Sequence, residues 1–590
     1  MVVTLVGNPT TTARVQNSRS TDYARLHRPP QPWVFHDYSP SLPMTTRTTR
    51  RNFLRTGSLA AVAATVGPSG WRFTKPHWPR PPQHPTGGSI DDPDFKGLAL
   101  GALDAAKAAG AIYADVRFTV TRRQRVDASG LPHNWEISAA GIRALTKEGA
   151  WGFAAHSEWT PDTVAWLGKT AVDFARASAW PGRPSVDLGE RPAAAVGSWS
   201  MPVKRDPFTV SDEEKLTVIR ELFDKAKKAA VAHGSSSRDV PSLELCFYFE
   251  RQERVFASTD GSFTRQTVYN TFGDTPYEQS HLVLNAKRGE TLTQYRVPLV
   301  SPSGVGFEVF DEINVEERIS EWQSKAHAQL TARKLPSLGR YDIVFDATAM
   351  AELISRTLGP KLEIDRALGY DASSVPPPLE HIMGVQAWSP LVSITADRGM
   401  VGGAATVQWD DDGVTPQTFP VVREGAVVDY ATSREFAGAL APWYRSHKQP
   451  VRSHGCAVAE DASRPPSVFT PNLQLHPGSA DATFDDLVAG LEDGLAVEGG
   501  RIFSVDPAGD SGTGRGEIVH IVKQGKRVAM VNGATYLFRA KELWKNVVAL
   551  GGASSAATRG FSMEKTQPAQ RAVHSVRAVA ARVKDVHVTV

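Results

Sequence analysis

The chain has 590 residues, of which 41% are hydrophobic and 22% charged, as expected of a globular protein with more than one domain. Its formal net charge of +3 is close to balance and argues against nucleic-acid binding through a basic field. No internal apolar run approaches the roughly 20 residues that a membrane-spanning helix needs. The only cysteines are Cys246 and Cys456, which excludes a disulfide framework and a cysteine-based zinc module but leaves one disulfide between them open.

The first 91 residues are not expected to belong to a folded domain. Residues 1–43 are rich in Arg, Pro, Ser and Thr, which predicts disorder. Residues 44–67 carry Arg50-Arg51 and a short apolar run, a pattern typical of a cleaved twin-arginine signal, with Met44 as the expected start. A basic disordered tail is the alternative interpretation. Residues 68–91 are rich in Pro, Trp, Gly and His, which predicts a linker.

Residues 92–334 are predicted to form an N-terminal α+β domain. Asp92-Pro93 predicts a helix start and Gly110 its end, followed by a strand whose apolar residues alternate from Ala114 to Val120. Further capping and turn signals predict the rest of the domain: a capping box of Ser211 with Glu214, a hairpin turn at Asp260-Gly261 and a helix from Asn314 to about Lys334.

Residues 335–590 are predicted to form a mostly-β, barrel-like or sandwich domain, because short β-branched runs alternate with turn signals. It opens with a strand from Tyr341, after which Asp346 is the expected N-cap of a helix interrupted at Gly359-Pro360. Thr483 with Asp486 predicts the start of a second helix.

Four segments carry a resemblance to a known family: AGAIYADVRF (109–118), GAWGFA (149–154), SPLVSITADR (389–398) and DRALGY (365–370). Together they resemble the TldD/PmbA metallopeptidases, also called the modulator of DNA gyrase family. The resemblance implies a two-domain fold, with a mixed α/β N-terminal domain and a β-rich C-terminal domain. It also implies a peptide substrate, because the family cleaves unfolded or extended peptides inside a closed two-subunit assembly.

The metal-binding positions of the family depart from its pattern here. Intact members read H-E-x-x-x-H before D-R-A-L-G-Y and bind zinc, with a cysteine near the C-terminus as third ligand. The corresponding positions hold Ser355, Arg356, Pro360 and Met563. A serine hydroxyl and a thioether are weak zinc ligands, proline has no side-chain donor, and arginine puts a permanent cation at the site. The resemblance therefore predicts no bound zinc.

Three structural expectations follow from this alignment. Five-residue spacing places two side chains about 140° apart on a regular helix, so the motif requires a local bulge or bend. The four replaced residues should nevertheless meet at one cleft. Arg356 is predicted to be held by a carboxylate, with Glu363 or Asp365 as the expected partner. These two carboxylates are predicted to pair with Arg356 or Arg366; the alternative is that they are leftovers that once oriented a metal-binding histidine.

The run Ser453-His454-Gly455-Cys456 is the alternative candidate site. On a strand, His454 and Cys456 would point the same way, and such a pair can be nucleophilic. The competing interpretation is a structural turn.

Three functions remain open from the sequence. The first is an exported, non-catalytic peptide-binding homologue, which forms a homodimer or a heterodimer with a metal-bearing TldD-like homologue through a large interface. The second is an active hydrolase with other ligands. The third is a structural or surface-binding protein.

Overall fold

The computed structural model describes residues 93–589 except for 128–132, 180–185, 233–242, 245, 274–279, 289–290, 312, 314, 371–382, 507–508 and 566–568. The predicted disordered segment, export signal and linker lie outside the described residues. The described residues belong to one compact unit, and the predicted division between residues 334 and 335 stays a prediction.

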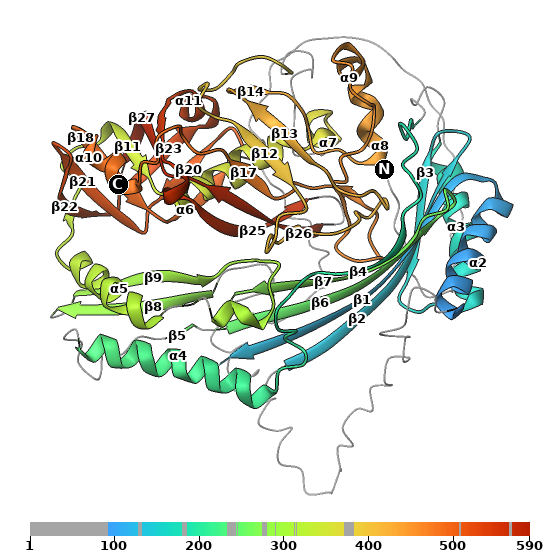
Figure 1. Ribbon diagram of the computed structural model, residues 1–590, viewed down its shortest axis with the longest axis horizontal. Helices are drawn as coiled ribbons and strands as arrows, with labels where there is room; N and C mark the ends of the chain where they lie inside the picture. Colours follow the sequence, from blue (N-terminus) through green and yellow to red (C-terminus); the bar gives the residue numbers. More distant parts are fainter. Residues whose placement is uncertain are drawn as a thin grey trace, which may run out of the picture. The chain divides into compact units, whose positions relative to one another are not determined.

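The N-terminal part is built on a six-stranded sheet in the order β3-β2-β1-β6-β7-β4. Its elements are α2 (Pro93–Ala109), β1 (Ala111–Asp127), β2 (His133–Thr146), β3 (Trp151–His156), α3 (Pro161–Ser178), β4 (Val196–Ser200), β6 (Cys246–Ser258) and β7 (Phe263–Phe272). Helix α2 ends where predicted, because Gly110 adopts a φ of +107° that favours glycine. Both helices pack on the sheet through an apolar cluster that includes Phe95, Phe118 and Leu167 (Figure 1).

A second, three-stranded sheet in the order β5-β8-β9 carries two more helices. Its elements are α4 (Asp212–Ala232), β5 (Leu243–Glu244), β8 (Ser280–Arg288), β9 (Thr291–Val300), the 3₁₀ turn Phe307–Phe310 and α5 (Val315–Gln329). Ser211 caps α4 as predicted, because its Oγ accepts from the Glu214 N–H at 3.1 Å. Helix α5 ends at Gln329, five residues before the predicted Lys334, and the chain then enters strand β10 (Arg333–Lys334).

The C-terminal part holds two large sheets. The ten-stranded sheet runs β10-β22-β21-β18-β11-β27-β23-β20-β19, with β24 paired to β27, and the six-stranded sheet runs β14-β13-β12-β17-β26-β25. The strands are β11 (Gly339–Phe345), β12 (Ile394–Asp397), β13 (Thr418–Arg423), β14 (Ala426–Val427), β15 (Ala457–Val458), β16 (Ser467–Val468), β17 (Leu473–Leu475), β18 (Asp493–Glu498), β19 (Arg501–Val505), β20 (Ser511–Arg515), β21 (Ile518–Lys523), β22 (Lys526–Asn532), β23 (Thr535–Arg539), β24 (Val547–Leu550), β25 (Ala557–Lys565), β26 (Gln570–Ala578) and β27 (Ala581–Thr589).

The α+β class is confirmed, whereas the barrel-like form of the C-terminal part is wrong for the strands that the structure describes. Each large sheet ends in two different edge strands and does not close on itself. The helices among them are short: α6 (Ala347–Leu353), α7 (Ile364–Ala367), α8 (Arg434–Ala437), α9 (Ala441–Ser446), α10 (Phe484–Ala489) and α11 (Ala540–Lys545). Helix α10 starts after Thr483 as predicted, and the start is a capping box in which the Thr483 and Asp486 side chains accept from each other's backbone N–H.

The helical segment after β11 bends at the predicted place. The Asp346 carboxylate caps α6 by accepting from the Ala349 N–H at 2.7 Å. The helix then widens into a π-helical turn, Ile354–Leu358, and tightens into a 3₁₀ turn, Gly359–Leu362. A π turn followed by a proline changes the direction of the side chains along the segment, so the bend that the intact motif requires is retained without its histidines.

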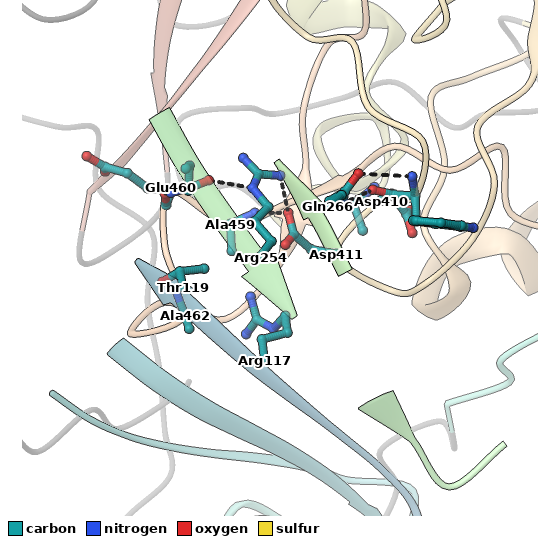
Figure 2. Close-up of polar contacts among 12 residues, drawn as sticks. Arg117, Thr119, Arg254, Gln266, Asp410, Asp411, Ala459, Glu460 and Ala462 are labelled. Carbon is teal, nitrogen blue, oxygen red and sulfur yellow. Dashed lines mark hydrogen bonds and ion pairs between the residues drawn. The ribbon is translucent and has the colours of Figure 1, made fainter. Parts of the chain in front are cut away.

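Polar contacts join the N-terminal sheet to the C-terminal part. Alternation along β1 predicts one buried face, but the other face is buried too, because residues 409–464 cover it. Arg143 bridges Asp115 at 2.7 Å and Asp412 at 2.6 Å. Figure 2 shows the neighbouring contacts, in which Arg254 lies beside Asp411 and Thr119 beside Ala462. Buried charges are costly unless they are paired, and here each pair joins the N-terminal sheet to a residue of the C-terminal part or to another strand of the sheet.

Candidate functional site

The π-helical turn places Ser355 against the final β-hairpin. Its Oγ lies 3.0 Å from Nε2 of His574 on β26, and both residues are buried. Burial, followed by repulsion from the nearby Arg356, lowers the pKa of His574 to about 3. The imidazole is therefore neutral and shares a hydrogen bond with the serine, an arrangement that satisfies two buried polar groups.

Arg356, the next residue, faces a cleft and is 40% exposed at its side chain. Its Nε lies 3.4 Å from Oε1 of Glu352, and its Nη1 lies 3.5 Å from the Ser562 carbonyl oxygen of β25. Glu352 is held at a shorter distance, 3.0 Å, by Arg559. The prediction that Glu363 or Asp365 pairs with Arg356 is wrong, because a carboxylate one turn earlier on the same helix is closer.

Glu363 and Asp365 instead belong to a buried ion cluster around Lys565. The Lys565 Nζ donates to Glu363 Oε2 at 2.9 Å and to Asp365 Oδ2 at 2.7 Å. Arg366 also donates to Glu363 at 2.9 Å, and Thr470 donates to it from its backbone and its hydroxyl. Burial raises the pKa of Asp365 and the Glu363 charge raises it further, while Lys565 opposes both. The two carboxylates therefore act as ion-pair partners.

The other two replaced positions do not offer a free metal ligand either. Pro360 is the second residue of the 3₁₀ turn, and its carbonyl oxygen accepts from the Glu363 N–H. Met563 is buried in a small apolar cluster with Phe469 and Ala572. The register of β25 with β26 sets Met563 opposite Ala572 and Phe561 opposite His574. Met563 therefore lies on the same hairpin face as the partner of Ser355, while the meeting of all four positions stays a prediction.

The side chains at these positions do not fit a zinc ion. The Ser355 hydroxyl is engaged with His574, Arg356 is a cation, Pro360 lacks a side-chain donor and the thioether of Met563 lies among apolar groups. Among the residues that the structure describes, no group of three or more His, Cys, Asp or Glu side chains is arranged to hold a metal. No catalytic step through a metal can be derived for this geometry.

A cleft of about 840 Å³ lies beside the replaced positions. It is lined by β9, α5, the start of β19, Glu352 and Arg356 of the helical segment, and consecutive residues of β25. Among the described strands, β9 and β25 are each the last in their sheets. An outermost strand presents unpaired backbone donors and acceptors, so two such edges border one cleft.

His454 and Cys456 do not form a nucleophilic pair. Neither belongs to a strand, and Gly455 between them has a φ of +76° typical of a turn. His454 Nε2 faces Asp429 at 2.9 Å and Tyr444 at 3.1 Å rather than the thiol. Burial raises the pKa of Cys456 to about 12, so the thiolate nucleophile is absent near neutral pH. The structural interpretation of this run is supported. Cys246 and Cys456 both remain thiols, so no disulfide joins them.

Two residues of this region were not identified from the sequence. His574 lies in the last hairpin without any metal-type spacing to another histidine, and only the strand register brings it to Ser355. Lys565 lies on β25 without any local pattern that predicts its role, which depends on a contact with Asp365, 200 residues earlier in the chain. An available signal was missed for Arg356, since Glu352 stands four residues before it.

Comparison with known proteins agrees with this fold. Residues 338–589 match the sequence model of the PmbA/TldA metallopeptidase C-terminal domain. A protein described as a metalloprotease from Methanocaldococcus jannaschii is 22% identical over 374 residues, which cover 62% of this chain and 73% of the relative. A metalloprotease from Archaeoglobus fulgidus is 23% identical over 60% of this chain and 73% of its own length.

Solved structures show the same fold. A structure described as a modulator of DNA gyrase, from Thermotoga maritima, has a TM-score of 0.61 at 15% identity and covers 84% of this chain and 100% of its own. TldE from Thermococcus kodakarensis has a TM-score of 0.58 at 13% identity, with the same coverage of 84% and 100%. In the part of this chain that the structure describes, no helix is long and apolar enough to cross a membrane.

Proposed function

Because this chain belongs to the TldD/PmbA family, and because other side chains fill the family's metal positions, we propose that it binds extended peptides without hydrolysing them. The observation that carries this proposal is the pairing of Ser355 with His574 beside the cationic Arg356. A like unit charge 4 Å away costs about 4 kcal/mol in partly buried surroundings. A divalent cation beside Arg356 would meet roughly that repulsion for each of its charges.

The peptide site in this proposal is the cleft between β9 and β25. The Gly560 N–H donates to Ser301 Oγ at 3.0 Å, on the side of β25 away from β26. Backbone groups alternate along a strand, so those of Ser562 and Glu564 also point away from β26. An extended peptide can add to such an edge through main-chain hydrogen bonds, which do not depend on the side chains of the peptide.

The free part of this edge is short. At Gly560 the backbone of Pro302 approaches so closely that a Cβ would lie 1.7 Å from its carbonyl oxygen. Peptide pairing is therefore expected from Ser562 toward the end of β25, where Arg356 reaches the Ser562 carbonyl. Removing that side chain exposes the acceptor to a peptide N–H.

Peptide binding and hydrolysis are tested on the same material. Fluorescence anisotropy with a labelled, unfolded peptide measures binding, and mass spectrometry of the recovered peptide detects cleavage. We expect saturable binding, an intact peptide, and tighter binding for Arg356→Ala. Cleavage that a chelator abolishes would support an active metallopeptidase, and absence of binding would favour a structural or surface-binding protein.

Assembly and export are further parts of the proposal. The resemblance implies an enclosure made by two subunits, and a subunit without metal ligands can still complete it. We propose a homodimer or a heterodimer with a metal-bearing homologue, with an interface of roughly 2,000 Å² or more. Light scattering with and without a co-expressed homologue tests the assembly, and a strictly monomeric protein in both cases would contradict it. Replacing Arg50-Arg51 by two lysines should block export if residues 44–67 are a twin-arginine signal.

A further inference from the structure

A pocket of about 550 Å³ adjoins the peptide cleft at its β19 end. The two share Arg296, Arg501 and Glu517 as lining residues, so a ligand in the cleft can reach the pocket. Arg515, Asn532, Thr293 and Gln329 are the other polar residues described in its lining. Among the described lining residues, three are arginines and one is a carboxylate. We call this site the basic pocket.

Two of its arginines are direct cross-strand neighbours. The register of β19 with β20 sets Arg501 opposite Arg515. Directly opposed residues have Cβ atoms about 5 Å apart, and like charges at such a pair are destabilising. Arg501 lies over the ring of Phe503 with 5.1 Å to its centroid, and Arg515 donates to Asn532 Oδ1 at 2.8 Å. Neither guanidinium makes an ion pair within 4.0 Å with a residue that the structure describes.

The single carboxylate of the pocket does not offset these charges. Burial raises the pKa of Glu517, and the charges of Arg501, Arg515, Arg559 and Arg296 oppose that rise. Several guanidinium groups therefore act on one carboxylate that burial drives toward its neutral form. Two arginines that repel each other beside such a carboxylate provide a favourable position for one more anionic group.

We propose that the basic pocket binds the carboxylate of a glutamate or aspartate side chain in the peptide that the cleft holds. This inference rests on the proposed peptide-binding function and adds a preference to it. The strand edge of β25 binds any extended backbone, whereas the basic pocket selects acidic residues at one position along it. Planar guanidinium groups can hold a carboxylate through two parallel hydrogen bonds.

The test compares two peptides that differ in one residue. Labelled dodecapeptides of alanine and serine carry one glutamate or one glutamine, and a set moves that residue along the chain. Anisotropy gives the dissociation constant for the protein as it is, for Arg501→Gln, for Arg515→Gln and for the double variant. Arg340→Gln is the matched control, since this exposed arginine pairs with Asp585 at 2.8 Å on another surface.

At low ionic strength the glutamate peptide should bind about tenfold more tightly than the glutamine peptide at one position in the set, as one charge-assisted interaction allows. The preference should shrink with added salt, fall below about twofold in the double variant and persist in Arg340→Gln. A far-UV circular-dichroism spectrum and a urea midpoint like those of the unsubstituted protein show that each variant is folded. Equal affinity for both peptides, or a preference that survives the double variant, would overturn the acidic subsite while leaving peptide binding in place. If neither peptide binds, the proposed function fails and the subsite with it.

Discussion

Ser355 and His574 lie 219 positions apart in the chain, and their side chains meet at 3.0 Å in a buried hydrogen bond. By its resemblance to the TldD/PmbA family, the serine stands at the position expected for the first metal-binding histidine. A neutral imidazole from the last hairpin now occupies the contact, next to a guanidinium that disfavours its protonation. The position expected to bind the metal is thus part of the packed interior, which joins the helical segment to β26.

The His574 imidazole should make the protein sensitive to acid. Its pKa is lowered to about 3 in the fold, whereas an unfolded histidine titrates near 6.5. Below about pH 6.5 the unfolded chain binds a proton that the folded chain does not, so the free energy of unfolding falls as pH falls, by up to about 1.4 kcal/mol per pH unit. Urea unfolding between pH 4.5 and 7.5 should show a shallower dependence for His574→Gln. Identical slopes would mean that the folded histidine is not shielded from protons.

Breaking the buried ion cluster around Lys565 should strongly lower the free energy of unfolding. Lys565→Met keeps the volume but leaves Glu363 and Asp365 buried without their shared cation, which costs about 3–5 kcal/mol. Lys523→Met is the matched control, because this lysine is 54% exposed at its side chain and should change stability by about 0.5 kcal/mol or less. Urea unfolding at pH 7 measures both.

The cost of Lys565→Met should also depend on pH. The pKa of Asp365 is already raised by burial, and loss of the lysine raises it further. A raised carboxyl pKa means that the folded chain holds a proton that the unfolded chain has released, so stability falls as pH rises through that window. The destabilisation should therefore be smaller at pH 5 than at pH 8. A cost that is equal at both pH values would show that Asp365 keeps the same charge in the variant.

Much of the local structure around the site could be predicted from the sequence. Asp346 as N-cap and a bend before Pro360 follow from side-chain chemistry and helix geometry, and both are present. The partners of Arg356 and Lys565 could not be assigned in the same way. A carboxylate near an arginine in the sequence is one of several candidates, and tertiary packing decides among them. The contact of Ser355 with His574 depends on where the β25–β26 hairpin lies against α6, which no local pattern encodes.

Cys456 should not react with thiol reagents in the folded protein. Its pKa is raised to about 12 by burial, so a thiol reagent such as 5,5′-dithiobis-(2-nitrobenzoic acid) at pH 8 should not modify it until guanidinium unfolds the chain. Peptide mapping assigns the modified residue. Cys456→Ala should leave peptide binding unchanged. Two outcomes would support the catalytic interpretation of the His454–Cys456 run. One is rapid modification of Cys456 in the native state, and the other is loss of peptide binding, or of an associated hydrolysis, in Cys456→Ala.

Zinc content measures most directly whether Ser355, Arg356, Pro360 and Met563 have ended metal binding in this chain. The purified protein is incubated with excess zinc sulfate, desalted and analysed by inductively coupled plasma mass spectrometry. A homologue with an intact H-E-x-x-x-H is treated in parallel as the positive control. We expect near-stoichiometric zinc in the homologue and only background zinc in this protein. Close to one tightly held zinc per chain here would contradict the loss of the metal site and the non-hydrolytic function proposed from it.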